Sequence, residues 1–354
     1  MHTTASFSFR EALETLLARQ PLSPRQIEAA FQDVLSGECG EAETAALLIA
    51  LRMKGEEAEE IAGAARVLRQ LMIPLDTGGL SVVDTSGTGG DGTGTFNVST
   101  ASAFVVAGAG VPVVKHGNRS VSSTSGSADV LTALGIHLVA GTEWPALCLR
   151  EAGMAFCFAP YFHPVMACVA SLRQRLGVRT IFNCLGPLLN PAGAVYQIVG
   201  VGKPELLDSV AGAVARLGTQ RTFVVCGRDG LDEVSLSAPT LVREVCGSTV
   251  TAHEWRPDDF GLSPCQIDDI KVAGPADSAR LIRQVLDGVA GPAQGVVLAN
   301  AAAALWAAGR VASLREGVML ARDAIVRGKA RRVLDRLTAC SPVATEATNS
   351  SGKG

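Results

Sequence analysis

The residues best suited to chemistry form a glycine-rich segment and the polar stretch that follows it. Segment 86–100 reads SGTGGDGTGTFNVST, and half of its first ten residues are glycine. Glycine loses more conformational entropy on folding than any other residue, so this concentration indicates that the backbone itself approaches a ligand. From Gly92 to Ala128 the chain has no Asp or Glu, but it has Lys115, His116 and Arg119. Backbone N–H groups, hydroxyls and cations without carboxylates favour an anion such as phosphate.

Two nucleotide-binding motifs do not account for this segment. Residues 87–92 match the pattern GxGxxG, but a dinucleotide site also needs an acid about 20 positions further on to bind the ribose. That position falls inside the stretch that has no acids. A P-loop needs Gly-Lys followed by Ser or Thr at its end, and this loop lacks that ending. The sequence therefore predicts a phosphate site of another kind.

A second hydroxyl-rich loop and a pair of acids extend the predicted site. Stretch 118–127, NRSVSSTSGS, precedes a second helix, so two helix N-termini face one rim, which fits phosphate better than two tight turns alone. So many donors suit a sugar diphosphate, which would bring Mg²⁺. Asp232 and Glu233, which follow the predicted strand 221–227, are the candidate metal ligands. The alternative is that Asp229-Gly230 forms a plain turn and the two acids are solvated.

Seven stretches give the chain a resemblance to a known family. They are GTGGD (87–91), NVST (97–100), KHGNR (115–119), SGSADVLTALG (125–135), FAPYFHP (158–164), RTIFNCLGPLLNP (179–191) and DGLDE (229–233). In this order they resemble the anthranilate phosphoribosyltransferase family, of the class III phosphoribosyltransferase fold, from the helical start to about residue 338. The resemblance implies transfer of a phosphoribosyl group from 5-phosphoribosyl-1-diphosphate (PRPP) to the amino group of anthranilate. Pyrophosphate is released, and the reaction belongs to tryptophan biosynthesis.

The resemblance also implies roles for individual residues. Those expected to hold PRPP are Gly87, Gly89, Gly90, Asp91, Asn97, Ser99, Thr100, Lys115 and Ser127. Those expected to bind Mg²⁺, two ions with PRPP, are Ser99, Asp232 and Glu233, and the catalytic set is Lys115, Asp232 and Glu233. Those expected at anthranilate are Gly87, His116, Asn118, His163 and Arg173. Asp91 is unusual in an anion site, so we expect it to face the ribose or metal-bound water, or to order the loop through its own backbone N–H groups.

The chemistry of such a transfer agrees with the residue types. Cleavage of the ribose C1–O bond builds negative charge on pyrophosphate, which preorganised donors and Mg²⁺ stabilise. An aromatic amine is neutral and nucleophilic, so no serine or cysteine nucleophile and no strong base is needed. Arg173, in a predicted helix, has a guanidinium suited to a carboxylate, although it could also be an exposed helix arginine like Arg175. His163, before Pro164, could equally be a loop residue without a role.

The elements that must position these residues form two domains. The first seventy-odd residues read as helices, with a capping box at Ser8 and Glu11 and a second start at Ser23-Pro24. From about residue 80 strands alternate with helices, which predicts a mostly parallel sheet with helices on both faces. We expect the helical domain at 1–75 with roughly 162–185, the α/β domain at 76–161 and 186–340, and a disordered tail at 341–354. Predicted strands are 80–84, 111–115, 154–160, 196–202, 221–227 and 239–245.

Composition limits the other functional classes. The 354 residues are 47% hydrophobic with a formal charge of −3 and a pI near 6.0, which argues against nucleic-acid binding. We see no secretory signal and no membrane span, and nine cysteines without a Cys-x-x-Cys spacing indicate reduced thiols in a cytoplasmic protein. The family resemblance further implies a homodimer through the helical domain. A pyrimidine-nucleoside phosphorylase on the same fold, without the metal pair, and a non-catalytic paralogue that binds nucleic acid are the alternatives.

Overall fold

The first four helices form a bundle at one end of the molecule. The computed structural model describes residues 8–119 and 125–341, so the expected tail lies, apart from Ser341, outside the described residues. The bundle consists of α1 (Phe9–Leu17), α2 (Pro24–Ser36), α3 (Glu41–Lys54) and α4 (Ala58–Leu71). Ser23 and Gln26 form a reciprocal capping box at α2, whereas at α1 only the Ser8 side chain accepts a hydrogen bond, from the Glu11 N–H. The predicted helical start is therefore confirmed.

A seven-stranded sheet is the centre of the rest of the chain. Its order is β3-β2-β1-β4-β5-β6-β7, in which the first five strands are parallel and the last two antiparallel. The strands are β1 (Val83–Gly87), β2 (Val113–Gly117), β3 (Met154–Phe158), β4 (Tyr196–Gly200), β5 (Arg221–Gly227), β6 (Thr240–Cys246) and β7 (Thr249–Trp255). The expected combination of a helical domain and a mostly parallel sheet is confirmed.

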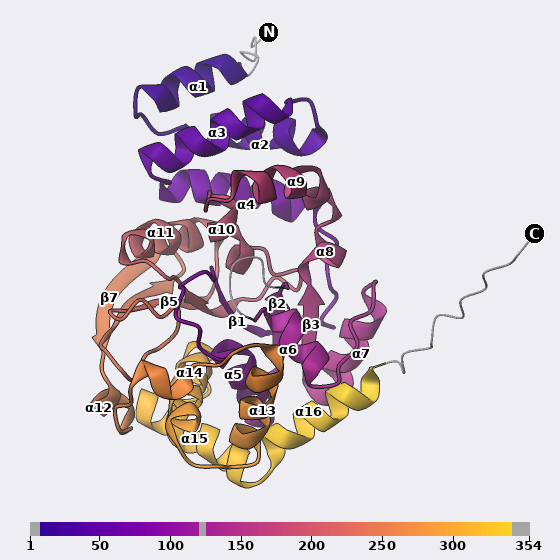
Figure 1. Ribbon diagram of the computed structural model, residues 1–354, viewed down its shortest axis with the longest axis vertical. Coiled ribbons are helices and arrows are strands. Elements are labelled where there is room, and N and C mark those ends of the chain that lie inside the picture. Colours follow the sequence, from indigo (N-terminus) through magenta and orange to yellow (C-terminus); the bar gives the residue numbers. More distant parts are fainter. Residues whose placement is uncertain (1–7, 120–124, 342–354) are drawn as a thin grey trace, which may run out of the picture.

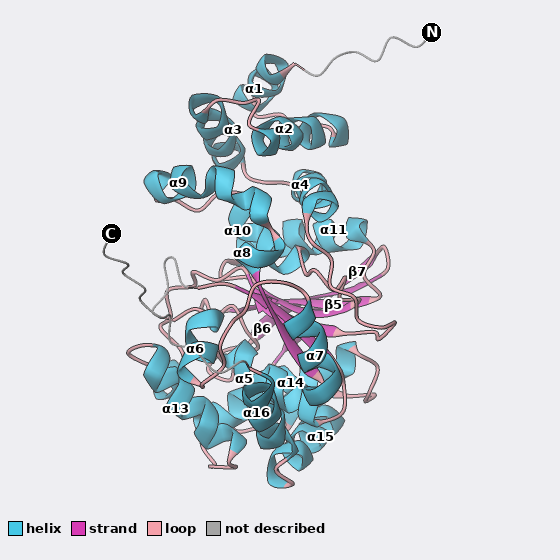
Figure 2. Ribbon diagram, turned by 90° about the vertical axis from the view of Figure 1, so that its right-hand side faces the viewer, coloured by secondary structure: helices cyan, strands magenta, loops and turns pink. Residues whose placement is uncertain are grey.

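Helices cover both faces of this sheet, and the alternation of side chains along β5 shows why. Phe223 and Val225 belong to the core shared with α5 (Val98–Gly108) and α14 (Pro292–Ala307). Val224 and Cys226 belong to the core shared with the bundle and α11 (Leu207–Leu217). Figures 1 and 2 show the bundle and α9 stacked beyond α10 and α11, with α5 and α13–α16 on the other side of the sheet. The remaining helices are α5 (Val98–Gly108), α6 (Ser127–Ala133), α7 (Glu143–Ala152), α8 (Ala159–Phe162), α9 (Ala167–Leu176), α10 (Phe182–Leu185), α11 (Leu207–Leu217), α12 (Pro257–Phe260), α13 (Pro275–Leu286), α14 (Pro292–Ala307), α15 (Leu314–Val326) and α16 (Lys329–Cys340).

Several strand predictions need correction. Strand β2 lies two residues later than the predicted 111–115, and β3 and β4 each end two residues earlier than predicted. The first strand begins at Val83, three residues later than expected, because residues 77–80 form a turn in which the Leu80 carbonyl accepts from the Thr77 hydroxyl. The edge strand β7 was not expected from the sequence, because most of its side chains are exposed and leave no apolar pattern. Among the described helices, none is long and apolar enough to cross a membrane.

Candidate active site

The expected site residues gather where the parallel strands end. Gly87, Gly117 and Gly227 are the last residues of β1, β2 and β5, and parallel strands place these ends at one edge of the sheet. The glycine loop (88–96), the second loop (118–126) and the acidic connection (228–239) all begin there. This edge is where α/β sheets bind ligands.

The glycine loop needs glycine for its backbone conformation. Gly89, Gly90, Gly92 and Gly94 have φ values of 62°, 67°, 73° and 71°, in the left-handed region that other residues avoid. Inside the loop, Asp91 Oδ1 accepts from the Thr93 N–H at 3.2 Å and Oδ2 from the Thr93 hydroxyl at 2.6 Å. Asp91 thus orders the loop through a backbone N–H, one of the roles expected for it.

Asn97 ties the start of α5 to two other segments. Its Oδ1 accepts from the Ser125 and Ser278 hydroxyls, each at 2.9 Å, and its Nδ2 donates to the Ser125 carbonyl at 3.2 Å. One turn later, the Thr100 hydroxyl is buried and has no hydrogen-bond partner within the described part of the chain. The helix start therefore holds the second loop in place.

Asp232 and Glu233 accept hydrogen bonds from two backbone N–H groups that would also suit a phosphate. Asp232 Oδ2 accepts from the Gly89 N–H at 3.0 Å, and Glu233 Oε1 accepts from the Ser99 N–H at 2.9 Å. Burial and the nearby Asp91 raise the pKa of Asp232 to about 7. Burial and Asp232 raise the pKa of Glu233 to about 8. Both pKa values are raised first by burial and then by neighbouring negative charge, which a bound cation would offset. The two carboxylates and the nearby Ser99 hydroxyl are oxygen donors of the kind that Mg²⁺ prefers.

Lys115 lies beneath both the loop and the acids. Its Nζ donates to the Thr85 carbonyl and, at 3.0 Å, to the Ser99 hydroxyl, and the side chain is almost wholly buried. Burial lowers its pKa, while Asp84, Glu233 and Asp232 act in the opposite direction. Buried Asp84 is held in turn by the His116 N–H, the Ser86 hydroxyl and the Asn190 amide. The lysine thus has a fixed position, and the strand that carries it is tied to Asp84.

His116 and His163 form a buried edge-to-face pair, with ring centroids 5.0 Å apart. His116 Nδ1 lies 3.0 Å from the Gly186 carbonyl, and His163 Nε2 lies 3.0 Å from the Leu189 carbonyl. A carbonyl only accepts, so these nitrogens carry the hydrogens and His116 Nε2 and His163 Nδ1 are free acceptors. Neither acceptor has a hydrogen-bond partner in the described part of the chain. Burial lowers both pKa values to about 4, so both rings are neutral.

Arg173 differs from its neighbour Arg175. Arg175 is exposed and pairs with Glu41 at 3.0 Å, whereas the partly buried Arg173 guanidinium lies 5.1 Å from the centre of the Phe182 ring. Within the described residues, no ion pair or side-chain hydrogen bond engages the Arg173 guanidinium. Burial lowers its pKa. A half-buried cation without an anion is suited to a carboxylate ligand.

The second loop contributes less defined geometry. The Asn118 side chain is exposed and its Oδ1 accepts from the Arg119 N–H at 2.7 Å, while its carbonyl accepts from the Ser127 hydroxyl at 3.4 Å. Residues 120–124 of this loop lie outside the described residues. The structure thus links the glycine loop, Ser99, Lys115 and the acid pair directly, and pairs the two histidines. It shows no hydrogen bond from the side chain of Arg173 or Asn118 to the other expected residues within the described ranges.

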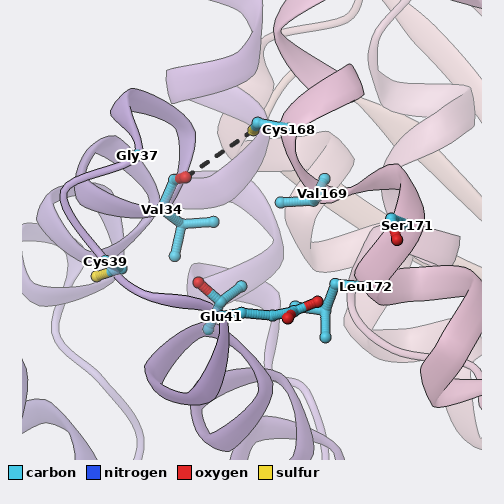
Figure 3. A pocket seen from close by; sticks show the side chains of 9 residues that line it. Val34, Gly37, Cys39, Glu41, Cys168, Val169, Ser171 and Leu172 are labelled. Atoms are coloured by element: carbon cyan, nitrogen blue, oxygen red, sulfur yellow. Dashed lines mark hydrogen bonds between the residues drawn. The ribbon is translucent and has the colours of Figure 1, made fainter.

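A small cavity lies elsewhere, between α2, α3 and α9 (Figure 3). Its volume is about 160 Å³, and its lining includes Val34, Glu41, Cys168 and Leu172. The neighbouring Arg173 does not line it, nor does any other expected site residue. We assign this cavity no part in the chemistry.

Comparison with known proteins shows the family to which the chain belongs. Residues 79–331 match the model of the glycosyl transferase family a/b domain, and residues 10–72 that of its helical bundle domain. The anthranilate phosphoribosyltransferase of Symbiobacterium thermophilum is 50% identical over 316 residues, 89% of this chain and 93% of the relative. This chain belongs to the anthranilate phosphoribosyltransferase family.

Solved structures of the anthranilate phosphoribosyltransferase family share the whole fold. The enzyme of Thermus thermophilus superposes with a TM-score of 0.86 at 41% identity, over 93% of this chain and 98% of that one. The Saccharomyces cerevisiae enzyme in complex with PRPP and Mg superposes with a TM-score of 0.85 at 31% identity, over 94% and 97% of the two chains.

Sequence reasoning did not assign several residues of this family member's site. Asp84 and Asn190 hold the strand that carries Lys115, Ser278 holds Asn97, and Arg179 donates to the glycine loop. Gly200 has no room for a side chain, since a Cβ there would lie 1.6 Å from the Asp232 carbonyl oxygen. Asp84 could have been noticed as an acid inside a buried strand, a costly placement without partners. Arg179 and Asn190 lie in the stretch 179–191 that carries the family resemblance, whereas Ser278 and Gly200 carry no comparable local signal.

Proposed function

We propose that this chain transfers the 5-phosphoribosyl group of PRPP to the amino group of anthranilate, in a Mg²⁺-dependent reaction of tryptophan biosynthesis. The observation that carries the proposal is the position of Asp232 and Glu233. Both acids accept hydrogen bonds from the glycine loop and the start of α5, next to buried Lys115. A metal site and an anion site at one place are what a sugar diphosphate requires.

The diphosphate half of the site would be built from the glycine loop, the start of α5 and Lys115. Mg²⁺ held by Asp232, Glu233 and the Ser99 hydroxyl would neutralise charge that develops on the leaving pyrophosphate. Acids engaged with the metal would release the Gly89 and Ser99 N–H groups to which they are now bonded. The Thr100 hydroxyl, buried and unpartnered among the described residues, adds a donor. These groups stabilise the leaving group without a covalent intermediate.

The acceptor half would be built from Arg173 and the histidine pair. The Arg173 guanidinium can hold the carboxylate in a bidentate manner. His116 Nε2 and His163 Nδ1 are neutral acceptors, which match the N–H donors of an aromatic amine. Gly87 and Asn118 complete the proposed acceptor set. Because the nucleophile is already neutral, placing it next to ribose C1 provides much of the rate enhancement.

The broader organisation is part of the same proposal. We infer two Mg²⁺ ions with PRPP, a homodimer through the helical domain and a cytoplasmic location. We also infer a helical domain of residues 1–75 with roughly 162–185, with the remainder to 340 as the α/β domain. The contact of α3 with α9 supports assigning residues 162–185 to the helical domain.

The test is the loss of anthranilate fluorescence on incubation with PRPP and Mg²⁺. We expect loss that depends on all three components and stops when EDTA is added. The outcome that contradicts the proposal is stable fluorescence at high enzyme concentration together with phosphorolysis of thymidine or uridine. That result would identify a pyrimidine-nucleoside phosphorylase instead.

A further inference from the structure

Arg179 connects the acceptor half of the site to the glycine loop. It lies between α9 and α10, and its two terminal nitrogens donate to consecutive carbonyls of the loop. Nη2 donates to Thr88 O at 3.2 Å and Nη1 donates to Gly89 O. No acidic side chain pairs with Arg179 in the described ranges. Its hydrogen bonds therefore go to the backbone of the loop, while its charge also acts on Asp232, whose pKa it lowers against the effect of burial.

The planarity of the peptide group makes this contact consequential. In a trans peptide the C=O and the next N–H point in opposite directions. The Thr88 carbonyl faces Arg179, so the Gly89 N–H faces the other way, where Asp232 Oδ2 accepts it at 3.0 Å. The Gly89 carbonyl also faces Arg179, so the Gly90 N–H faces away as well. Within the described residues this N–H has no partner. Arg179 thus directs two consecutive donors away from itself, and the first of them reaches Asp232.

Glycine makes this orientation necessary. Gly89 and Gly90 both have positive φ, and glycine peptide planes rotate more freely than others. The loop has few other anchors near this point, notably the bond from Thr88 N to Gly200 O at 2.8 Å. Without Arg179, the Thr88–Gly89 plane would keep only its bond to Asp232, and the Gly89–Gly90 plane would have no hydrogen bond within the described residues.

The segment that carries Arg179 also carries the proposed acceptor groups. Arg173 lies six residues before it, and the Gly186 and Leu189 carbonyls that fix the two histidine rings follow it. The Thr180 N–H donates to Asn183 Oδ1 at 2.9 Å, which fixes the turn into α10. The segment that holds Arg179 therefore also positions the residues proposed to bind the acceptor.

We propose that Arg179 is a positioning residue that fixes the Thr88–Gly90 peptide planes, so that the glycine loop presents its N–H groups to the diphosphate. The inference rests on the proposed function for the identity of the substrate. It assigns Arg179 no contact with the reacting atoms. A lysine at this position could hold one of the two carbonyls and would restore part of the effect.

The experiment compares Arg179→Ala, Arg179→Lys and the control Arg175→Ala. Binding of inorganic pyrophosphate with Mg²⁺ is measured by calorimetry, and KM is measured for PRPP and for anthranilate. We expect Arg179→Ala to weaken pyrophosphate binding and to raise the KM for PRPP by about tenfold or more, the lower end of the effect of losing one charge-assisted hydrogen bond. We expect Arg179→Lys to recover part of this, with the KM for anthranilate and the melting temperature near the wild-type values.

Three results would overturn the inference. They are unchanged pyrophosphate affinity in Arg179→Ala, an equal loss in Arg175→Ala, or an equal rise in both KM values. The pyrophosphate measurement requires no transfer reaction. If the wild type consumed no anthranilate, the proposed function would be wrong, and the pyrophosphate affinities of the wild type and the variants would still test the role of Arg179.

Discussion

Replacement of Arg173 by methionine tests the acceptor site with opposite effects on activity and stability. The guanidinium is partly buried over Phe182 and has no ion pair within the described part of the chain, so it stabilises the fold little. Methionine keeps much of the apolar stem and removes a partly desolvated charge. The ligand-free variant should therefore be as stable as the wild type or more stable.

The cost should appear in anthranilate binding. A hydrogen bond to a charged group contributes about 1.5–3 kcal/mol, so its loss corresponds to about a 10- to 150-fold increase in the KM for anthranilate. The KM for PRPP should change little, because the glycine loop and Lys115 lie at the other half of the site. Aniline lacks the carboxylate, so the preference of the wild type for anthranilate over aniline should shrink by the same factor.

The assay is the fluorescence decrease of anthranilate under saturating PRPP and Mg²⁺, with product chromatography for aniline. Arg175→Ala is the control, because that arginine pairs with Glu41 on the surface. An unchanged KM for anthranilate in Arg173→Met, or an unchanged preference over aniline, would refute the assignment. A melting temperature well below that of the wild type would refute the view that this charge lacks a partner.

Three further predictions concern the acids, a histidine and a glycine. The pKa values of Asp232 and Glu233 are raised from 3.8 and 4.5 to about 7 and 8, so their contribution to stability is fully present below pH 4 and is lost progressively as pH rises to about 8. In metal-free protein, Asp232→Asn and Glu233→Gln should therefore raise the melting temperature more at pH 8.5 than at pH 6. Their activity with Mg²⁺ should fall about a hundredfold or more. A melting temperature below that of the wild type at pH 8.5 would argue against this account. The pKa of His116 is about 4, so the ring stays neutral and the KM for anthranilate should stay flat from pH 6 to 8. The contribution of His116 to stability should decline as pH falls from 6.5 towards 4, opposite in sign to that of the two acids, and denaturation curves of the Asp232→Asn/Glu233→Gln double variant measure it without the acids. A KM that changes between pH 6 and 8, or stability of that variant that does not fall below pH 6.5, would contradict this assignment. Gly200→Ala should displace the acidic connection and lower both the Mg²⁺-dependent activity and the melting temperature. Gly274→Ala is the control, because its Cβ would lie in open space, and neither quantity should change. Equal changes in activity and melting temperature in the two variants would contradict the packing argument.

Local pattern predicted most of the elements because their signals lie within short windows. The apolar strand β5 was expected with the bounds that the structure shows, and helix α9 was expected around Arg173. The exposed edge strand β7 was not predicted because it lacks an apolar face. The Gly-Ser pair at 247–248 is typical of a hairpin turn and could have indicated it. The start of β1 was missed because pairing with a neighbouring strand, not local composition, sets where a strand begins.

The sequence by itself determined the kind of site in this protein. Its glycine loop, its acid-free stretch and the pair Asp232–Glu233 specify donors and a metal-binding set through residue type alone, which is local information. Only the tertiary structure decided which groups meet. It placed both acids on backbone N–H groups, left Arg173 without an anion among the described residues and directed Arg179 at the loop. These contacts join segments that are 90 to 143 residues apart in the case of Arg179 and Asp232, and sequence periodicity carries no information over such distances.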